Sequence, residues 1–259
     1  MKTRISETFK KLQKLGKKAF IPYIMTGDPS LEKTKEVVLL FEECGADIVE
    51  LGVPFSDPLA DGPTIQRAAE RALQNGTTLR TVLSFVSDLR QVTQIPLVLM
   101  TYFNPVFRYG TEDFISNARN AGIDGVIIPD LLPDEAGDFV RNSRSHGLDT
   151  IFLLAPTSTE KRIKRVIKAS HGFIYYVAIT GITGANLLLD GSMEILIAHI
   201  RQYTENPIAV GFGVSTPDDA AHVAKLSDGV IIGSAIVKRL HENPAKLKDY
   251  LFSLRQAIS

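Results

Sequence analysis

Short apolar segments alternate with helical patterns along the whole chain, and this alternation restricts the folds that the chain can adopt. The apolar segments are almost continuous, as parallel strands covered by helices on both faces require. Eight of them are predicted as strands: Ala19–Met25, Asp47–Leu51, Pro96–Tyr102, Gly125–Pro129, Thr150–Leu154, Phe173–Val177, Pro207–Gly211 and Val230–Gly233.

Helical spacing of apolar residues fills the intervals between these segments. Ile5, Phe9, Leu12 and Leu15 predict an amphipathic helix before the first strand. The later helices are predicted at Ser30–Phe41, Thr64–Gln74, Leu79–Val92, Thr111–Ala121, Asp134–His146, Glu160–Ala169, Met193–Tyr203, Thr216–Lys225 and from Ser234 onward.

Eight strand and helix units in 259 residues indicate an α/β fold. They match the closed (β/α)8 barrel, the TIM barrel, better than an open sheet with a second domain. The barrel is expected to carry an extra N-terminal helix and additional helices after strands two and eight. No linker or low-complexity stretch marks a boundary, so a single domain over residues 1–259 is expected.

Charge and cysteine content narrow the functional classes. The 29 Lys and Arg balance the 29 Asp and Glu, so binding to nucleic acid or to a membrane surface is not expected. The one cysteine, Cys44, forms no internal disulfide, which fits a reducing compartment. Neither a signal peptide nor a run of membrane-spanning length is visible, and a cytoplasmic protein is expected.

The loop from Glu50 to Gln66 carries the strongest candidates for catalysis. In a barrel of this type the active site lies at the carboxyl ends of the strands. Glu50 stands in the last residues of a buried strand, where a carboxylate must be desolvated, paired or catalytic. A buried ion pair is the alternative, but no Lys or Arg occupies a strand end. Asp61 is a second candidate, although it could also be a helix-entry residue. Asp57 and Asp130 are weaker.

Other kinds of chemistry have fewer supporting residues. No strand end carries a Lys that could form a Schiff base. The five histidines fall on helices or helix exits, at spacings that make no metal ligand set. Carboxylate acid and base chemistry, without a metal, is therefore expected.

Glycines after the last strands predict a phosphate site. Gly213 follows the seventh strand, and Gly233 with Ser234 leads from the eighth strand directly into a helix. Glycines let backbone N–H groups approach an anion, and a helix N-terminus directs free donors at it. The segment Gly181–Gly184 after strand six would add donors. Tight barrel turns are the alternative reading of these glycines.

The loop from Glu50 to Gln66 closely resembles the signature of the tryptophan synthase α subunit family. The resemblance extends along the whole chain. It also includes Gly27-Asp28-Pro29, Met100–Pro105, Pro129-Asp130, Gly181–Gly184, Gly211–Gly213 and Gly233-Ser234.

This resemblance implies a lyase that cleaves indole-3-glycerol phosphate to indole and glyceraldehyde 3-phosphate, in tryptophan biosynthesis. Glu50 matches the family's general acid and base, and Asp61 matches the residue that binds the indole N–H. Tyr175 matches a tyrosine that lines the pocket. The implied substrate-binding residues are Tyr102, Tyr175 and Thr183, and the implied phosphate-binding residues are Gly184, Gly213, Gly233 and Ser234.

The resemblance also implies a β subunit partner in an α2β2 complex. Pyridoxal phosphate is expected in that partner, and no cofactor is expected in this chain. Pro54–Ala60 and Asn104–Arg108 would contribute to the contact, and Ile179–Asp190 would form a mobile lid. One departure is Ala178-Ile179, where many members have Ser-Arg.

Three alternatives stay open at this point. A neighbouring barrel enzyme could act on another phosphorylated indole or anthranilate intermediate, although the pair of Glu50 and Asp61 argues against it. A weakly active α-like subunit could mainly activate its β partner, which Ile179 keeps possible. A free-standing lyase could release indole without any partner.

Overall fold

Nine parallel strands form one sheet in the part of the chain that the structure describes. The computed structural model describes residues 2–177, 191–211 and 213–259. The strands are β1 (Ala19–Met25), β2 (Val49–Gly52), β3 (Leu97–Met100), β4 (Gly125–Ile127), β5 (Asp149–Ile151), β6 (Leu153–Leu154), β7 (Ile174–Val177), β8 (Ile208–Gly211) and β9 (Gly229–Ile232).

The sheet closes into a barrel through two short consecutive strands. The strand order β5-β4-β3-β2-β1-β9-β8-β7-β6 places β5 and β6 at the two ends of the sheet. Only Phe152 separates them in the sequence, and its carbonyl oxygen accepts a hydrogen bond from the N–H of Tyr175 at 3.1 Å. The expected strand Thr150–Leu154 is therefore found as β5 and β6, and the predicted (β/α)8 barrel is confirmed.

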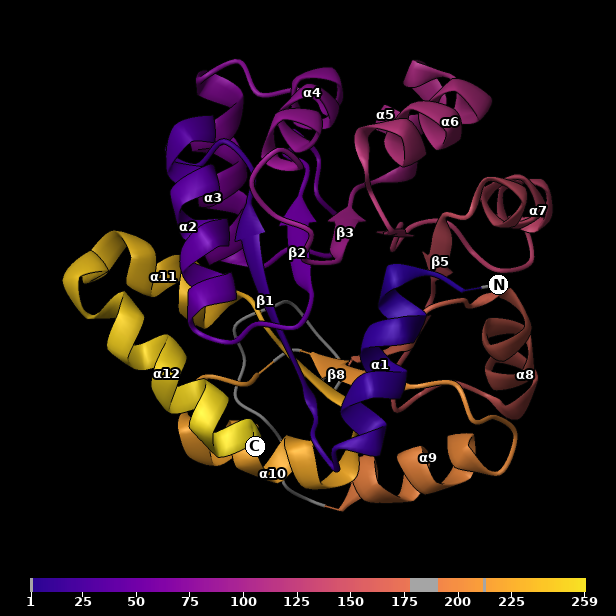
Figure 1. Ribbon diagram of the computed structural model, residues 1–259. Helices are drawn as coiled ribbons and strands as arrows, with labels where there is room; N and C mark the ends of the chain where they lie inside the picture. The colour runs from indigo at the N-terminus through magenta and orange to yellow at the C-terminus, as the bar shows by residue number, and fades with distance from the viewer. Residues whose placement is uncertain (1, 178–190, 212) are drawn as a thin grey trace.

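Helices surround the strands (Figure 1). The expected N-terminal helix is α1, and the additional helices follow β2 and the last strand, as predicted. Within the described ranges the helices are α1 (Arg4–Lys14), α2 (Leu31–Glu43), α3 (Pro63–Gln74), α4 (Leu79–Leu89), α5 (Phe103–Tyr109), α6 (Thr111–Ala121), α7 (Gly137–His146), α8 (Glu160–Ala169), α9 (Ser192–Arg201), α10 (Pro217–Leu226), α11 (Ser234–Glu242), the 3-10 helix η1 (Pro244–Lys246) and α12 (Leu247–Ile258).

The short helix α5 was not predicted from the sequence. It has only seven residues, with Pro105 in its first turn, where a proline removes no intrahelical hydrogen bond. The Oδ1 atom of Asp130 accepts a hydrogen bond from the N–H of Phe103 at 2.9 Å, at the start of this helix. Asp130 thus fixes α5 to the loop after β4, which accounts for its position without a catalytic role.

Helix α7 begins three residues later than expected. Asp134 was predicted to open it, but residues 133–135 form a turn. The carbonyl oxygen of Leu132 accepts hydrogen bonds from the N–H groups of Glu135 and Ala136, both at 3.0 Å. The turn uses donors that would otherwise belong to a first helical turn, so the helix begins at Gly137.

The N-terminal helix closes one mouth of the barrel. Ile5, Phe9 and Leu12 of α1 are buried together with inward-facing strand residues such as Val98. The rings of Phe9 and Phe173 lie 5.7 Å apart. A second layer of apolar residues fills the space between the outer faces of the strands and the surrounding helices. Because α1 fills the amino-terminal mouth, open space inside the barrel is left toward the carboxyl ends of the strands.

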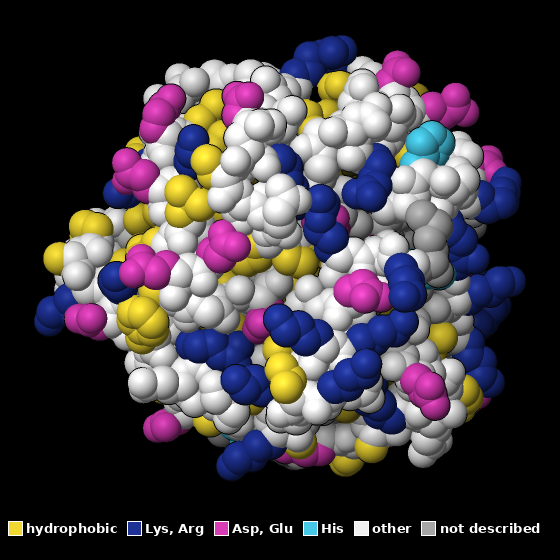
Figure 2. All heavy atoms as spheres, viewed as in Figure 1, with side chains coloured by type: hydrophobic (Ala, Val, Ile, Leu, Met, Phe, Trp, Pro, Cys, Tyr) yellow, Lys and Arg dark blue, Asp and Glu magenta, His cyan; other side chains and the backbone are white. Residues whose placement is uncertain are grey.

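Lys and Arg side chains are numerous on the face that Figure 2 shows, which includes α1 and α8. Acidic side chains are interspersed among them, and the whole chain has no net charge. Among the described helices, none is long and apolar enough to cross a membrane.

Candidate active site

A cavity of roughly 660 Å³ opens at the carboxyl ends of the strands. This volume lies within the range of about 300–1,000 Å³ that is usual for small-molecule sites. Its described lining residues are Tyr23, Glu50, Asp61, Thr64, Ile65, Met100, Tyr175, Gly213, Val214, Ser215, Thr216, Ile231, Gly233, Ser234, Ala235, Lys238, Arg239, Glu242 and Asn243.

Glu50 is a buried carboxylate without a cation beside it. It belongs to β2, where it pairs with Tyr23 of β1 and Val98 of β3, and only 1% of its surface is exposed. Its Oε2 atom has no hydrogen-bond partner among the described residues, and no described Lys or Arg forms an ion pair with it. Burial, followed by repulsion from Asp61, raises the pKa of Glu50 to about 8. The alternative of a buried ion pair therefore finds no support in the described part of the chain.

Asp61 lies near Glu50 and is held by a tyrosine. The hydroxyl of Tyr102 donates a hydrogen bond to the carboxylate of Asp61 and accepts one from the N–H of Ala60 at 3.0 Å. Burial raises the pKa of Asp61 to about 6, and the hydrogen bond from Tyr102 opposes that shift. The side-chain amide of Gln66 donates to the Asp61 carbonyl oxygen at 2.8 Å, which fixes the backbone of the loop.

The side chains of two buried tyrosines fit inside the barrel because a glycine faces each hydroxyl. A Cβ atom added to Gly52 would lie 2.1 Å from the hydroxyl oxygen of Tyr23, and one added to Gly211 would lie 2.3 Å from that of Tyr175. Any side chain at either glycine would collide with the tyrosine hydroxyl. Burial is the largest cause that raises the pKa of both tyrosines, so both hydroxyls stay protonated at neutral pH.

The N-terminus of α11 offers open hydrogen-bond donors to the cavity. Gly233 is its N-cap residue, without a side-chain cap and without an acidic residue in the first turn. The N–H groups of Ile236 and Val237 bond to the Gly233 carbonyl oxygen, at 2.9 and 3.0 Å. The N–H groups of Ser234 and Ala235 have no acceptor among the described residues. Such an end binds anions.

The neighbouring helix α10 differs, because its own residues occupy its N-terminal donors. The Oδ2 atom of Asp219 accepts hydrogen bonds from the N–H groups of Ser215 and Thr216, at 3.0 and 2.9 Å. The Asp219 N–H in turn donates to the Thr216 hydroxyl oxygen at 3.1 Å. Of these two helices, α11 is therefore the one whose N-terminal N–H groups are free to bind an external anion.

The loop between β8 and α10 is fixed from the C-terminal helix. The Tyr250 hydroxyl donates a hydrogen bond to the Ser215 carbonyl oxygen at 2.8 Å. The guanidinium carbon of Arg239 lies 4.0 Å from the centre of the Tyr250 ring, a cation–π contact. Gly213 in this loop has a positive φ of 78°, which a glycine adopts without strain. These contacts hold the loop against the cavity.

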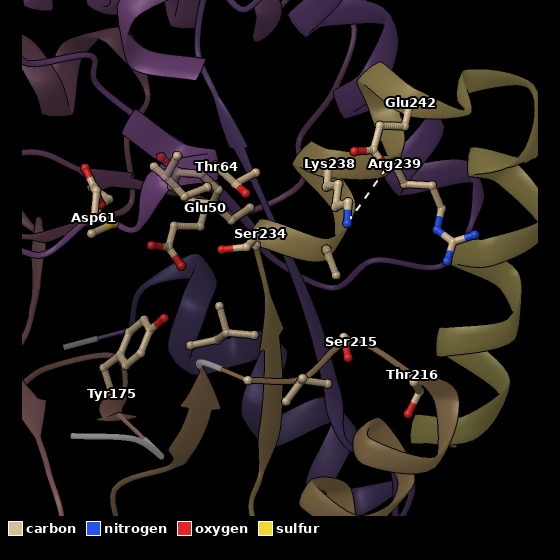
Figure 3. Close-up of a pocket in the computed structure, with 18 of the residues that line it drawn as sticks. Glu50, Asp61, Thr64, Tyr175, Ser215, Thr216, Ser234, Lys238, Arg239 and Glu242 are labelled. Carbon is tan, nitrogen blue, oxygen red and sulfur yellow. Dashed lines mark ion pairs between the residues drawn. The ribbon is translucent and has the colours of Figure 1, made fainter. Parts of the chain in front are cut away.

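The cavity has two chemically different ends (Figure 3). The carboxylates of Glu50 and Asp61 lie toward one end, with Tyr175 opposite them, and Ser215 and Thr216 lie toward the other. Ser234 lies between these groups. The end with Glu50 and Asp61 can exchange protons with a substrate, and the open N-terminus of α11 at Ser234 can bind a negatively charged group.

Most of the residues predicted from the sequence meet in this cavity. Tyr102 is outside the described lining set and acts on Asp61 instead. Thr183 and Gly184, together with the unusual Ile179, lie outside the described residues. The predicted residues that line the cavity are Glu50, Asp61, Tyr175, Gly213, Gly233 and Ser234.

Tyr23 and Lys238 are two of the polar lining residues that the sequence analysis did not identify. Tyr23 was overlooked because Met25 ends its strand, but alternation along β1 places Tyr23 on the inner side with Ala19 and Ile21. Lys238 was overlooked because it lies within a helix. Its spacing of four residues from Ser234 is the signal that could have identified it.

Across residues 2–177, 191–211 and 213–259, no group of three or more His, Cys, Asp or Glu side chains could hold a metal ion. The described polar neighbours of the carboxyl pair Glu50 and Asp61 include the hydroxyls of Tyr23, Tyr102 and Tyr175. The arrangement suits proton transfer.

The chain is similar to known proteins over nearly its whole length. The family model described as tryptophan synthase alpha chain matches residues 9–257. The tryptophan synthase alpha chain of Geotalea uraniireducens is 50% identical over 240 residues, which are 93% of this chain and 90% of that protein. The tryptophan synthase alpha chain of Geobacter sulfurreducens is 48% identical over 261 residues, with 99% of both chains covered.

Solved structures show the same fold. A chain of Mycobacterium tuberculosis tryptophan synthase superposes with a TM-score of 0.93 and 38% identity, covering 100% of this chain and 99% of that one. Tryptophan synthase subunit alpha from Legionella pneumophila gives a TM-score of 0.91, also at 38% identity, with 100% and 99% covered.

Proposed function

We infer that Glu50 and Asp61 carry out the reaction of this chain, which belongs to the tryptophan synthase alpha chain family. The chain is a lyase that cleaves indole-3-glycerol phosphate to indole and glyceraldehyde 3-phosphate in tryptophan biosynthesis. The neighbouring barrel enzyme, the weakly active α-like subunit and the free-standing lyase are not favoured.

Glu50 is the general acid and base of this proposal. The carbon–carbon bond to the indole ring breaks more easily once C3 of the ring is protonated, because the ring then accepts the bonding electrons. A pKa of about 8 keeps Glu50 mainly protonated at neutral pH, so it can donate that proton. The resulting carboxylate takes the proton of the side-chain hydroxyl as the carbonyl of glyceraldehyde 3-phosphate forms. Glu50 ends the cycle protonated again.

Asp61 stabilises the ring while it is positively charged. A pKa of about 6 leaves Asp61 mainly ionised at neutral pH, so its carboxylate can accept the indole N–H and offset the charge. The two carboxyl groups thus differ in protonation, and their surroundings cause the difference. Tyr175, and Thr183 in the part of the chain that is not described, are proposed to contact the substrate, and Tyr102 positions Asp61.

The phosphate group lies at the N-terminus of α11 in this proposal. Open N–H groups of Ser234 and Ala235 supply donors at the N-terminus of α11. Gly213 and Gly233 leave space for close approach, and Gly184 is proposed to add a further donor. A substrate anchored by its phosphate would hold its ring beside the two carboxylates.

The observation that supports these roles most is the unpaired, buried state of Glu50 beside an ionised Asp61. Glu50→Gln keeps the shape of the side chain but can neither donate nor accept the proton. General acid and base catalysis contributes roughly 10²–10⁴-fold, so indole release should fall by about that factor or more. Binding of glycerol 3-phosphate should be nearly unchanged. Substantial residual turnover in a single-turnover indole assay would contradict the assignment.

The alpha chains of this family need no cofactor of their own and have a β subunit as partner. We propose that the complex has α2β2 stoichiometry and that pyridoxal phosphate belongs to the β subunit. Leu59, Phe107 and Leu132 support a contact at the carboxyl-end loops, because 81%, 68% and 43% of these apolar residues are exposed. Leu59 and Phe107 fall within the two segments expected to meet the partner. Sedimentation of mixed subunits measures the stoichiometry directly.

One barrel domain over residues 1–259 is proposed to carry the whole α reaction, and its place in central biosynthesis supports a cytoplasmic location. If the chain could be divided into two halves that fold independently, the proposal of a single domain would be wrong.

A further inference from the structure

Lys238 is a cationic side chain in the cavity that the roles proposed above do not use. It lies on α11, four residues after Ser234, so both residues share one face of the helix. Helical side chains tilt toward the N-terminus, which carries Lys238 back over the first turn. In Figure 3 its ammonium group points into the space between α11 and Ser215, beside the proposed phosphate position.

The present partner of Lys238 holds it weakly. Its Nζ atom lies 3.9 Å from the Oε2 atom of Glu242, and the two side chains are 63% and 65% exposed. Exposed pairs of this kind contribute little and exchange easily. The ammonium group is therefore available to another anion.

The other cation of the described lining set is already engaged. Arg239 packs its guanidinium group over the ring of Tyr250 at 4.0 Å. Figure 3 shows it directed away from Ser234. Among the described lining residues, Lys238 is thus the cation that can reach a group bound at the N-terminus of α11.

A phosphorylated substrate needs such a cation on electrostatic grounds. A phosphate monoester carries about −1.5 to −2 charges at neutral pH. It must enter a cavity that already contains the ionised Asp61 and, at its rim, Glu242. Backbone N–H groups at a helix end carry only partial charges.

We propose that Lys238 leaves Glu242 and pairs with the substrate phosphate, and so sets the preference for a phosphorylated over an unphosphorylated substrate. The inference rests on the proposed phosphate position at α11. The positive charge of the ammonium group attracts the phosphate dianion during entry, and the ion pair holds the phosphate after binding. Dissolved salt weakens this attraction, because the ammonium group is exposed.

Lys238→Met tests the proposal, because methionine keeps most of the length of the chain and removes the charge. Steady-state cleavage of indole-3-glycerol phosphate is measured at about 0.02 M and about 0.3 M salt. At low salt KM should rise about tenfold, the scale of one charge-assisted hydrogen bond. The salt dependence of KM in the unaltered protein should largely disappear in the variant. Cleavage of unphosphorylated indole-3-glycerol should have the same kcat/KM in both proteins.

Two further variants separate charge pairing from structural damage. Lys225→Met removes an exposed cation of α10, outside the cavity, and should leave KM and its salt dependence unchanged. Glu242→Gln removes the competing partner of Lys238 and should lower KM at low salt. If Glu242→Gln raised KM as Lys238→Met does, the ion pair itself would be the required element, and the proposal would be wrong.

The outcomes distinguish this proposal from the proposed function beneath it. If the unaltered protein cleaved the phosphorylated and unphosphorylated substrates equally well, the proposed phosphate position would be wrong. If it preferred the phosphorylated substrate and Lys238→Met kept both the full preference and the salt dependence, only the role of Lys238 would be overturned. Equal losses on both substrates would indicate a structural effect and would also overturn it.

Discussion

Glu50 and Asp124 are carboxylates of nearly equal burial with opposite surroundings. Both are almost fully inaccessible, with 1% and 2% of their surfaces exposed. Asp124 directly precedes β4, and Arg4 and Arg90 bind its two oxygens at 2.9 and 2.8 Å. Glu50 has no described cation beside it, and one of its oxygens has no described hydrogen-bond partner.

The difference distinguishes a carboxylate that stabilises the fold from one that can transfer protons. Asp124 also accepts a hydrogen bond from the Leu97 N–H at 3.0 Å, and Arg119 approaches it at 3.8 Å. It therefore joins α1, α4, α6 and the start of β3. A carboxylate bound in this way stabilises the fold, whereas an unpaired buried one is free to exchange protons near neutral pH.

Asp61 is intermediate between these two. One neutral donor, Tyr102, supports its ionised form against burial. The three carboxyl groups thus form a series in which protein contacts to the carboxylate decrease from Asp124 through Asp61 to Glu50. The variants Asp124→Asn and Glu50→Gln change members of this series, and Tyr102→Phe changes the donor to its remaining member, Asp61.

The largest effect on stability is expected for Asp124→Asn. Removing the charge leaves the partly buried Arg90 without its carboxylate, and breaking a buried ion pair costs about 3–5 kcal/mol. Urea denaturation should show this loss, while kcat of the folded variant changes little. Asp138→Asn, which breaks an exposed pair with Arg141, is the matched control and should cost less than about 1 kcal/mol. Equal stability of both variants would remove the distinction between Asp124 and Glu50.

Glu50→Gln should have the opposite effect on stability. The pKa of Glu50 is raised from an ordinary 4.5 to about 8 in the folded protein. The unfolded chain therefore ionises first, and stability is lost as the pH rises from about 4.5 to about 8. Because the variant avoids that loss, it should be more stable than the unaltered protein by on the order of 3 kcal/mol at pH 7.

The same comparison near pH 4 supplies the control for Glu50→Gln. Both the folded and the unfolded protein then bind the proton, so the two proteins should be equally stable within error. A variant that is less stable at pH 7 would indicate that Glu50 contributes a stabilising contact, as Asp124 does.

A smaller effect is expected for Tyr102→Phe, which removes the donor to Asp61. Loss of this hydrogen bond should raise the pKa of Asp61 above about 6, because the ionised form loses its support. The acid limb of the kcat profile should shift to higher pH. At pH 6 the rate should fall about threefold to tenfold, equivalent to about 1 kcal/mol, and near pH 8 it should recover. A uniform loss at every pH would instead point to displacement of the loop.

The sequence is sufficient to predict features that follow from local patterns. Continuous apolar segments such as Ala19–Met25 indicated strands of a parallel sheet, and their number indicated the barrel. Glu50 was identifiable because a carboxylate in a buried strand is rare. The short helix α5 was not, because its seven residues are too few to show helical periodicity.

Contacts between distant segments could not be predicted. Nothing in the sequence around Tyr102 indicates that its hydroxyl meets Asp61, because the contact depends on how the loop after β2 folds over the neighbouring strand β3. The open N-terminus of α11 was expected from Gly233, but the self-capping of α10 through Asp219 became visible only in the structure. Relative positions of this kind are set by tertiary packing.

The protonation state of Glu50 at neutral pH decides whether this carboxyl group can act as the general acid. Carbon-13 NMR of the Glu side-chain carboxyl carbons, with Glu50→Gln to assign the resonance, measures its pKa in the folded protein. We expect a titration midpoint near 8, because burial without a cation favours the protonated form. A midpoint near the ordinary value of 4.5 would contradict the role of general acid, because Glu50 would then be ionised at neutral pH and unable to protonate the indole ring.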